Sequence, residues 1–152
     1  MNTRWMLSAA LALPLLLALP ARAIDPKPAL PEPDAQGLYA GYRALSLPMS
    51  GYKIVFLEKG QRVDVMVTFD AVMKDKRKEK VTATILMNVV VVNVQKPAKL
   101  EENGVVELLL NPNETQYAAL SLYQGELSIA RRAAGDTTMA PLEMASLRKL
   151  FR

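Results

Sequence analysis

The sequence predicts a mainly β (α+β) fold: a small β-rich domain with one helix inserted before its last strand and a short C-terminal helix. Residues 62–70 alternate between apolar and polar side chains, which is typical of a strand with one buried face. Residues 81–95 are rich in β-branched side chains, whose restricted χ1 rotamers suit a pleated sheet. Residues 111–125 combine a helix start signal with a stop signal. These observations place one longer helix among strands.

The N-terminus has the pattern of a bacterial secretory signal peptide, which we assign to residues 1–23. Arg4 supplies the positive charge, Met6–Leu19 is apolar, and Ala21 and Ala23 are the small residues that a signal peptidase reads. The apolar run is shorter than the roughly 20 residues that a membrane span needs. We therefore expect cleavage, a periplasmic location and no stable membrane span afterwards. Retention by an uncleaved N-terminal anchor is the alternative.

Cleavage would leave 129 of the 152 residues, which is the length of one domain. The net charge would fall from +4 to +2, because two of the arginines lie in the signal, so we expect no nucleic-acid partner. Residues 24–41 form a proline-rich leader, extended over residues 24–36 because proline blocks both helix and ladder hydrogen bonds. The domain itself is assigned to residues 42–132, and residues 133–152 form a C-terminal tail.

The first predicted strand is Arg43–Leu47, an edge strand that Pro48 ends. The alternating strand at residues 62–70 follows, and the charged segment at residues 74–80 forms a turn between two strands. This segment is either a solvated hairpin tip that protects strand edges, or a basic loop that contacts anionic headgroups or an acidic partner. Its basic residues are Lys74, Lys76, Arg77, Lys78 and Lys80.

The strand at residues 81–95 is too long to run straight, so we expect a bend or bulge near Met87 and Asn88. Its valines follow one another without alternation. Such a run indicates either a strand covered on both faces or a surface that contacts a partner or a second copy. The valines of this candidate surface are Val89, Val90, Val91, Val92 and Val94.

After a strand at residues 105–110, the sequence 111–114 (NPNE) predicts a helix with an Asn cap, a first-turn proline and a capping glutamate. The helix should run to about residue 124, where Gly125 would end it in the left-handed conformation. Tyr117, Leu120 and Tyr123 recur every three residues, so we expect them to face the core. Residues 126–131 are the predicted last strand.

The tail contains a turn at Gly135 and Asp136, followed by apolar residues that can share one face of a short helix. This segment either docks on the domain and seals a sheet edge, or serves as a helical peptide for a groove in a partner. Its apolar residues are Met144, Leu147, Leu150 and Phe151.

The chain has neither histidine nor cysteine, which removes thiol nucleophiles, Ser-His pairs and the commonest ligands of transition metals. Asp64, Asp70 and Asp75 do not match the spacing of a calcium loop. We therefore expect no catalytic residues, no metal site and no cofactor. A hydrolase built on carboxylates alone is the remaining enzymatic alternative, and it requires two acidic side chains in one cleft.

Residues 56–65 (FLEKGQRVDV) resemble the F-[IL]-x-P-G-D-R-V-D-V signature of the CpaB/RcpC family of Flp (Tad) pilus assembly proteins. Residues 84–89 (TILMNV), 106–114 and 126–131 (ELSIAR) resemble later segments of that family in the same order. Lys59 and Gln61 stand where the family has proline and aspartate. Few residues separate the expected cleavage site from Tyr42, so we expect the family's N-terminal β-clip (SAF) module to be missing. The matched signature positions are Phe56, Leu57, Gly60, Arg62, Val63 and Asp64.

This resemblance implies a non-catalytic periplasmic accessory factor of a type IVb pilus or related secretion machine. Its partners would be other assembly proteins, above all the outer-membrane secretin, with a homo-oligomer as a further option. From the residues, Gly60 should supply a turn conformation, and Arg62 and Asp64 should pair with each other or across strands. The functional alternative is a cell-envelope module that binds glycan (peptidoglycan).

Overall fold

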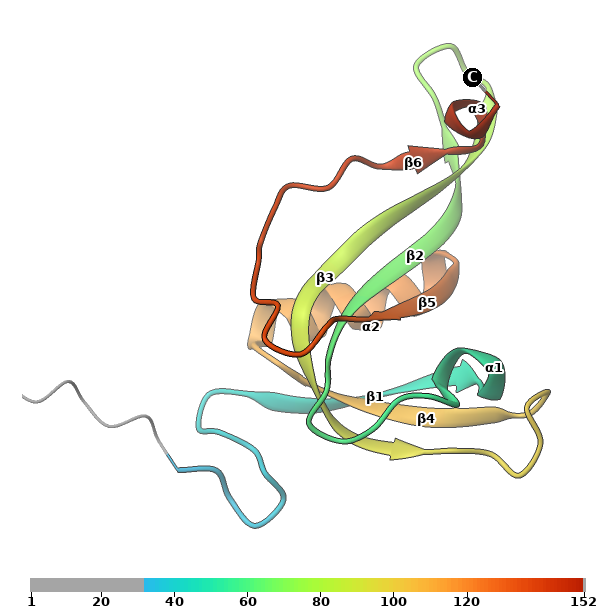
Figure 1. Ribbon diagram of the computed structural model, residues 1–152. Coiled ribbons are helices and arrows are strands. Elements are labelled where there is room, and N and C mark those ends of the chain that lie inside the picture. Colours follow the sequence, from blue (N-terminus) through green and yellow to red (C-terminus); the bar gives the residue numbers. More distant parts are fainter. Residues whose placement is uncertain (1–31, 152) are drawn as a thin grey trace, which may run out of the picture. The chain divides into compact units, whose positions relative to one another are not determined.

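The computed structural model describes residues 32–151, so the predicted signal peptide and the start of the leader lie outside the described residues. The described part is mainly β, as predicted (Figure 1). In chain order its elements are β1 (Arg43–Ser50), α1 (Gly51–Ile54), β2 (Arg62–Val72), β3 (Lys78–Gln95), β4 (Asn103–Leu110), α2 (Pro112–Gln124), β5 (Glu126–Arg131), β6 (Ala145–Ser146) and α3 (Leu147–Leu150).

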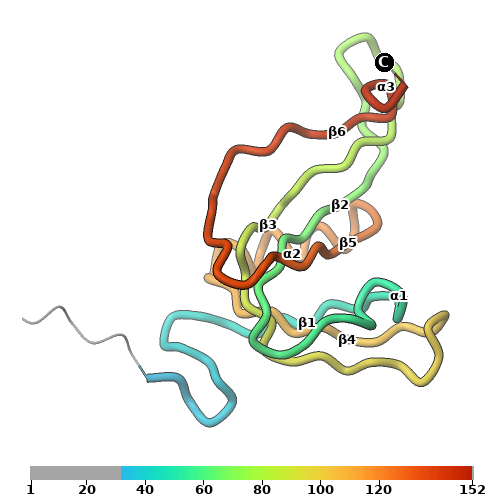
Figure 2. The backbone as a smooth tube through the Cα atoms, in the orientation of Figure 1, coloured from blue at the N-terminus to red at the C-terminus, as the bar shows by residue number. Residues whose placement is uncertain are grey.

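All strand pairs are antiparallel, and the strands of the sheet follow the order β1-β4-β3-β2-β5, with β6 paired to β3. The long strand β3 is the central strand of this sheet and joins one part, formed by β2 and β5, to the other part, formed by β4 and β1. Its first part pairs with β2, and its last part pairs with β4 (Figure 2). Helix α2 contacts strands from both parts, so that it closes one side of the core. The core side chains come from every strand from β1 to β5, from the helices α1 and α2, and from the loop after α1.

The predicted bend in β3 is confirmed at Asn88, whose φ of 57° is positive. The register between β2 and β3 shifts on either side of Val65, because Val63 faces Val89 whereas Val65 faces Leu86. The extra residues of β3 at these shifts are bulges, and bulges bend a strand and increase its twist. The bend lies just before the point where β3 gains β4 as a neighbour, because β2 pairs with β3 up to Val90 and β4 pairs with it from Val90 onward.

The predicted strands are present, with differences at their ends. The prediction that Pro48 ends the edge strand is wrong: β1 continues to Ser50, with Pro48 opposite Val105 of β4, because an edge strand tolerates proline. In β2, Val63, Val65 and Val67 are buried as the alternation predicted. β3 starts at Lys78, inside the segment that we predicted as a turn, so the turn itself is shorter.

The valine run of β3 lies in the core, so its prediction as an exposed partner surface is wrong. Val89, Val91 and Val92 are buried, and Val94 is half-buried against the core. Val90 pairs with Arg62 of β2 on one side and with Leu109 of β4 on the other. The alternative interpretation, a strand covered by its own domain, is the correct one.

Helix α2 begins with the predicted capping box. The Asn111 side chain accepts from the Glu114 N–H at 2.9 Å, and the Glu114 carboxylate accepts from the Asn111 N–H at 2.8 Å. The prediction for its faces is wrong, however, because the buried residues are Ala118 and Ser121. Small side chains let the helix axis approach the sheet closely, and the large side chains point outward as a result.

Gly125 follows the helix, but its prediction as a left-handed cap is also wrong, because its backbone is extended (φ −179°). The reason for glycine here is space. A Cβ atom on Gly125 would lie 2.1 Å from the backbone oxygen of Thr68 in β2. The residue is therefore required by the close approach of two chain segments and not by a turn.

The tail docks on the domain through its backbone. β6 pairs with Val81 and Thr82 of β3, so β5 is not the last strand, and the tail seals part of the β3 edge as one of the two predictions proposed. The predicted helix is only the four residues of α3, and Met144 precedes it. The apolar side chains of this segment stay exposed, contrary to simple docking by a buried face.

The described part of the leader is not extended throughout. Asp34 closes a turn: its carboxylate accepts from the N–H groups of Gln36 and Leu38 at 3.0 and 2.8 Å. Gly37 has a φ of 86°, which fits such a turn. Tyr39 and Tyr42 then stack edge to face just before β1.

Candidate functional site

The polar residues of the signature meet at the bend in β3. Asp64 accepts a hydrogen bond from the Asn88 N–H at 2.7 Å, and Arg62 donates through Nη1 to the Asn88 carbonyl oxygen at 2.8 Å. Both backbone polar groups of the left-handed residue are therefore satisfied by side chains of β2. Arg62 and Asp64 pair across strands with Asn88 and not with each other.

A second arginine completes this cluster. The Nε atom of Arg132 lies 3.7 Å from Asp64 and 3.4 Å from Asp136, and its Nη2 atom donates to the carbonyl of Thr138. The Arg132 side chain is only 8% exposed, and its Nη1 atom is buried without a partner. Two carboxylates therefore hold one buried guanidinium between β2 and the start of the tail.

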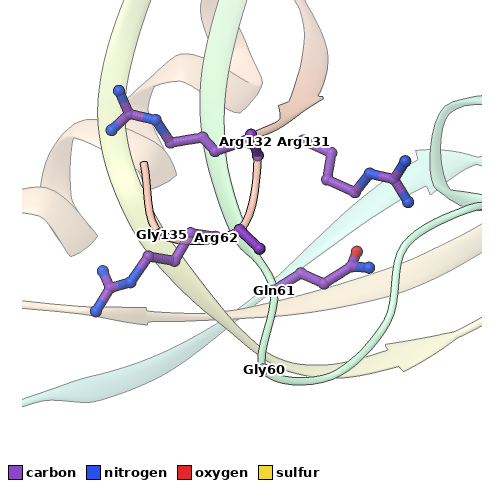
Figure 3. Close-up of a pocket in the computed structure, with 8 residues that line it drawn as sticks. Gly60, Gln61, Arg62, Arg131, Arg132 and Gly135 are labelled. Carbon is purple, nitrogen blue, oxygen red and sulfur yellow. The ribbon is translucent and has the colours of Figure 1, made fainter. Parts of the chain in front are cut away.

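A pocket of about 510 Å³ lies beside this cluster (Figure 3). The side chains of Arg62 and Arg132 extend to one side of it, whereas Arg131 extends to the opposite side. Arg131 Nη1 lies 3.4 Å from the carbonyl oxygen of Phe56. The pocket wall is Gly60, Gln61, Arg62, Arg131, Arg132, Ala133, Ala134 and Gly135.

The surroundings of Asp136 favour its ionised form. The Thr138 backbone N–H and, to a smaller degree, Arg132 hold the pKa of Asp136 below its ordinary value. Asp64 and Asp136 do approach the same cation, but Asp64 already uses Oδ1 for the Asn88 N–H. Asp64 therefore accepts a hydrogen bond at the bend, whereas Asp136 accepts from the Thr138 N–H and pairs with Arg132. Residues 32–151 contain no group of three or more acidic side chains that could hold a metal ion.

The other signature positions have structural surroundings. Gly60 has a φ of 86°, so the predicted turn conformation is confirmed, and its N–H donates to the Val91 carbonyl at 2.8 Å. Leu57 and Val63 are buried in the core, whereas Phe56 is exposed. The sequence predicted the bend at Asn88 but not its hydrogen bonds to Arg62 and Asp64, and it did not reveal the roles of Arg132 and Asp136. Only Asn88 had a local signal, since asparagine is unfavourable inside a strand of valines.

A surface that the sequence analysis missed lies on α2. Tyr117, Leu120 and Tyr123 are 65%, 57% and 90% exposed, and their spacing of three places them along the outward side of the helix. We call these three residues the outer face of α2. Two tyrosines and a leucine in a row form an apolar stripe with polar hydroxyl ends, which is the composition of protein interfaces.

The basic loop and the tail, which are distant in the sequence, lie together at the end of the β2–β3 hairpin (Figure 1). The backbone N–H of Arg148 donates to the Glu79 carboxylate at 2.9 Å, and Arg148 Nη2 lies 3.7 Å from Asp75. The five basic residues of the loop are exposed at this end of the domain.

No helix within residues 32–151 is long and apolar enough to cross a bilayer. Comparison of the chain with models of protein families, with curated proteins and with solved structures finds no match, so the functional argument depends on the surfaces described above.

Proposed function

We propose that this domain is a non-catalytic periplasmic assembly factor of a Flp (Tad) type IVb pilus or a related secretion machine. It acts by binding other assembly proteins, and the outer-membrane secretin is the first partner to test. The observation that carries the binding role is the outer face of α2, where Tyr117, Leu120 and Tyr123 are exposed while Ala118 and Ser121 face the sheet. Tyrosine is enriched among the residues that dominate binding energies.

The resemblance to the pilus assembly family supports the choice of system. Its most specific polar positions, Arg62 and Asp64 in one segment and Asn88 in another, form a single hydrogen-bonded cluster. Residues that form one hydrogen-bonded cluster depend on one another, so related chains are expected to keep all of them together. The same cluster explains these residues without catalysis, because it fixes the bend of β3.

The helix that carries the outer face is held at both ends by hydrogen bonds. The capping box fixes the first turn of α2, and the Gly125 N–H donates to Ser121 at the other end. A stripe held on a capped helix loses little conformational freedom on binding, which favours affinity.

The test is capture of the partner by the chain from residue 24 to residue 152. We expect the purified protein to form a complex with the secretin or another subunit of the same machine. The double variant Tyr117→Ser/Tyr123→Ser should weaken this complex at least about tenfold, because each tyrosine at an interface contributes on the order of 1 kcal/mol or more. Fluorescence anisotropy or calorimetry measures the dissociation constant.

The matched control is Tyr42→Ser/Tyr52→Ser, which removes two exposed tyrosines that lie outside α2. Both double variants should keep the circular dichroism spectrum of the wild type, since all four side chains are largely exposed. A folded protein that binds no assembly subunit, or equal losses in both double variants, would contradict the proposal. Saturable binding to peptidoglycan in the absence of protein partners would favour a glycan-binding module instead.

A further inference from the structure

The end of the β2–β3 hairpin carries a second surface, which is separate from the outer face of α2. It is built from the hairpin end, Val72–Lys80, and from the docked tail, Ala145–Phe151; we call it the basic tip. β6 holds the tail against β3, and the contacts of Arg148 with Glu79 and Asp75 hold α3 beside the turn. Because the strand pairs and the Arg148 N–H contact involve the backbone of the tail, the position of α3 does not depend on burial of its side chains.

The charges of the basic tip are unbalanced. Residues 72–80 and 145–151 contain seven lysines and arginines but two acidic residues, and Asp70 and Glu143 lie just outside these ranges. The carboxylates are already engaged: Asp70 with Lys80 at 3.2 Å, Asp75 with Arg77 at 3.7 Å, and Glu143 with Lys149 at 2.8 Å. Within the described residues, no ion pair involves Lys74, Lys76 or Lys78. These three cations are therefore available to an external anion.

The same end exposes large apolar side chains. Leu150 and Phe151 are 71% and 83% exposed at the end of α3, and Val72 is 68% exposed at the end of β2. Leaving such side chains in water is unfavourable, and a cluster of them marks a contact surface. The lysines beside them have long aliphatic stems that can lie along apolar surface while the ammonium groups stay in a polar layer.

We propose that the basic tip binds the surface of a bilayer that contains anionic phospholipids. Phosphate headgroups complement Lys74, Lys76 and Lys78, and Leu150 and Phe151 insert at the boundary of the headgroups and the acyl chains. An acidic protein would complement the charges, but α3, which contains Leu150, stands with the end of the hairpin at a projecting end of the domain (Figures 1 and 2). Charge and a small apolar insertion together produce the reversible attachment typical of peripheral proteins.

The test uses vesicle sedimentation of the chain from residue 24 to residue 152, which lacks the apolar segment of the predicted signal. The vesicles are phosphatidylcholine alone, and an equal mixture of phosphatidylcholine and phosphatidylglycerol. We expect binding to the anionic vesicles only, and a decrease as salt rises. The variant Lys74→Gln/Lys76→Gln/Lys78→Gln should lower the partition coefficient roughly a hundredfold, since each lysine near an anionic surface contributes about fivefold.

The matched control is Lys59→Gln/Lys96→Gln/Lys99→Gln, which removes the same charge from exposed lysines outside the tip. It should bind nearly as well as the wild type. Leu150→Ser/Phe151→Ser should weaken binding at low salt and abolish it at high salt, whereas Tyr117→Ser/Leu120→Ser should not. Equal losses in the two lysine variants, or equal binding to both vesicle types, would overturn the proposal. So would no vesicle binding by the folded wild type.

This inference stands apart from the proposed assembly role. The basic-tip variants leave the outer face of α2 intact and should still capture a protein partner. Loss of partner capture with vesicle binding unchanged would therefore count against the assembly role alone, and the reverse result would count against the membrane contact alone.

Discussion

The two ends of the β2–β3 hairpin differ in how completely their polar groups are satisfied. At the base, Arg62 and Asp64 bond both backbone groups of Asn88, and the neighbouring Val63 and Val89 are buried. At the tip, three lysines have no ion-pair partner among residues 32–151, and Val72 faces solvent. The base of the hairpin is thus hydrogen-bonded and packed, whereas its tip is exposed and carries unpaired charges.

The comparison suggests a division of tasks along a single pair of strands. A buried bend with unpaired donors would be costly, so the residues at the base are constrained by the fold itself. Exposed ion pairs contribute little to stability, so the residues at the tip can be selected for contact with something else. Substitutions at matched positions should separate these two roles.

The largest expected effect is at the base. Asp64→Ala removes the acceptor of the Asn88 N–H and one of the two carboxylates beside the buried Arg132. The free energy of unfolding should fall by about 2–4 kcal/mol, because an unpaired donor and a buried charge remain. Urea denaturation followed by circular dichroism measures the change.

The matched substitution at the other end is Asp70→Ala, which removes the partner of Lys80 in an exposed ion pair. Its effect should stay below about 1 kcal/mol. If the two alanine variants lost equal stability, the proposed difference in stabilising contacts between the base and the tip would be wrong.

A smaller effect is expected from the backbone of the bend. Asn88 has a positive φ, which costs a β-branched residue about 1–2 kcal/mol, so Asn88→Val should destabilise the domain by that amount. Asn88→Gly should cost less than Asn88→Val, since glycine adopts this conformation freely. The midpoints of thermal unfolding should rank the wild type and Asn88→Gly above Asn88→Val. If Asn88→Val were as stable as Asn88→Gly or more so, the positive φ at this position would not limit stability.

The smallest effect concerns pH at the tip. The Arg148 N–H and the Ser146 side chain hold the pKa of Glu79 below its ordinary value of 4.5. Since the docked tail favours the ionised carboxylate, the contribution of Glu79 to docking is fully present above pH 4.5 and is lost as the pH falls through the lower pKa of the docked state. The amide resonance of Arg148 should therefore shift with a midpoint below 4.5. In Glu79→Gln this transition should disappear, and a transition that persists would assign it to another group.

The local features of the fold were predictable from the sequence, because they depend on neighbouring residues. The alternation of Val63, Val65 and Val67 identified β2, and the pair Asn111 and Glu114 identified the start of α2. The length of the valine-rich segment was enough to predict a bend at residues 87–88. Gly60 was predictable as a turn residue, since its neighbours already formed a turn signal.

The contacts between distant segments were not predictable. Hydrophobic periodicity selected Tyr117 and Leu120 as the core face of α2, but the structure buries Ala118 because a close helix–sheet distance admits only small side chains. The tail docks by two backbone pairs and one N–H bond to Glu79, and such contacts leave no mark on composition. The same holds for Arg132, which reaches Asp64 from the far end of β5.

The missing side chain at Gly125 has a consequence for recognition. Since even one methyl group there would collide with the backbone of Thr68, replacing Gly125 by alanine would force the last turn of α2 away from the sheet. Tyr123, two residues earlier, would then change direction although nothing on the outward side of the helix had been altered. A search for binding residues restricted to exposed positions would overlook this glycine, yet the angle at which the tyrosines would meet the proposed partner depends on it.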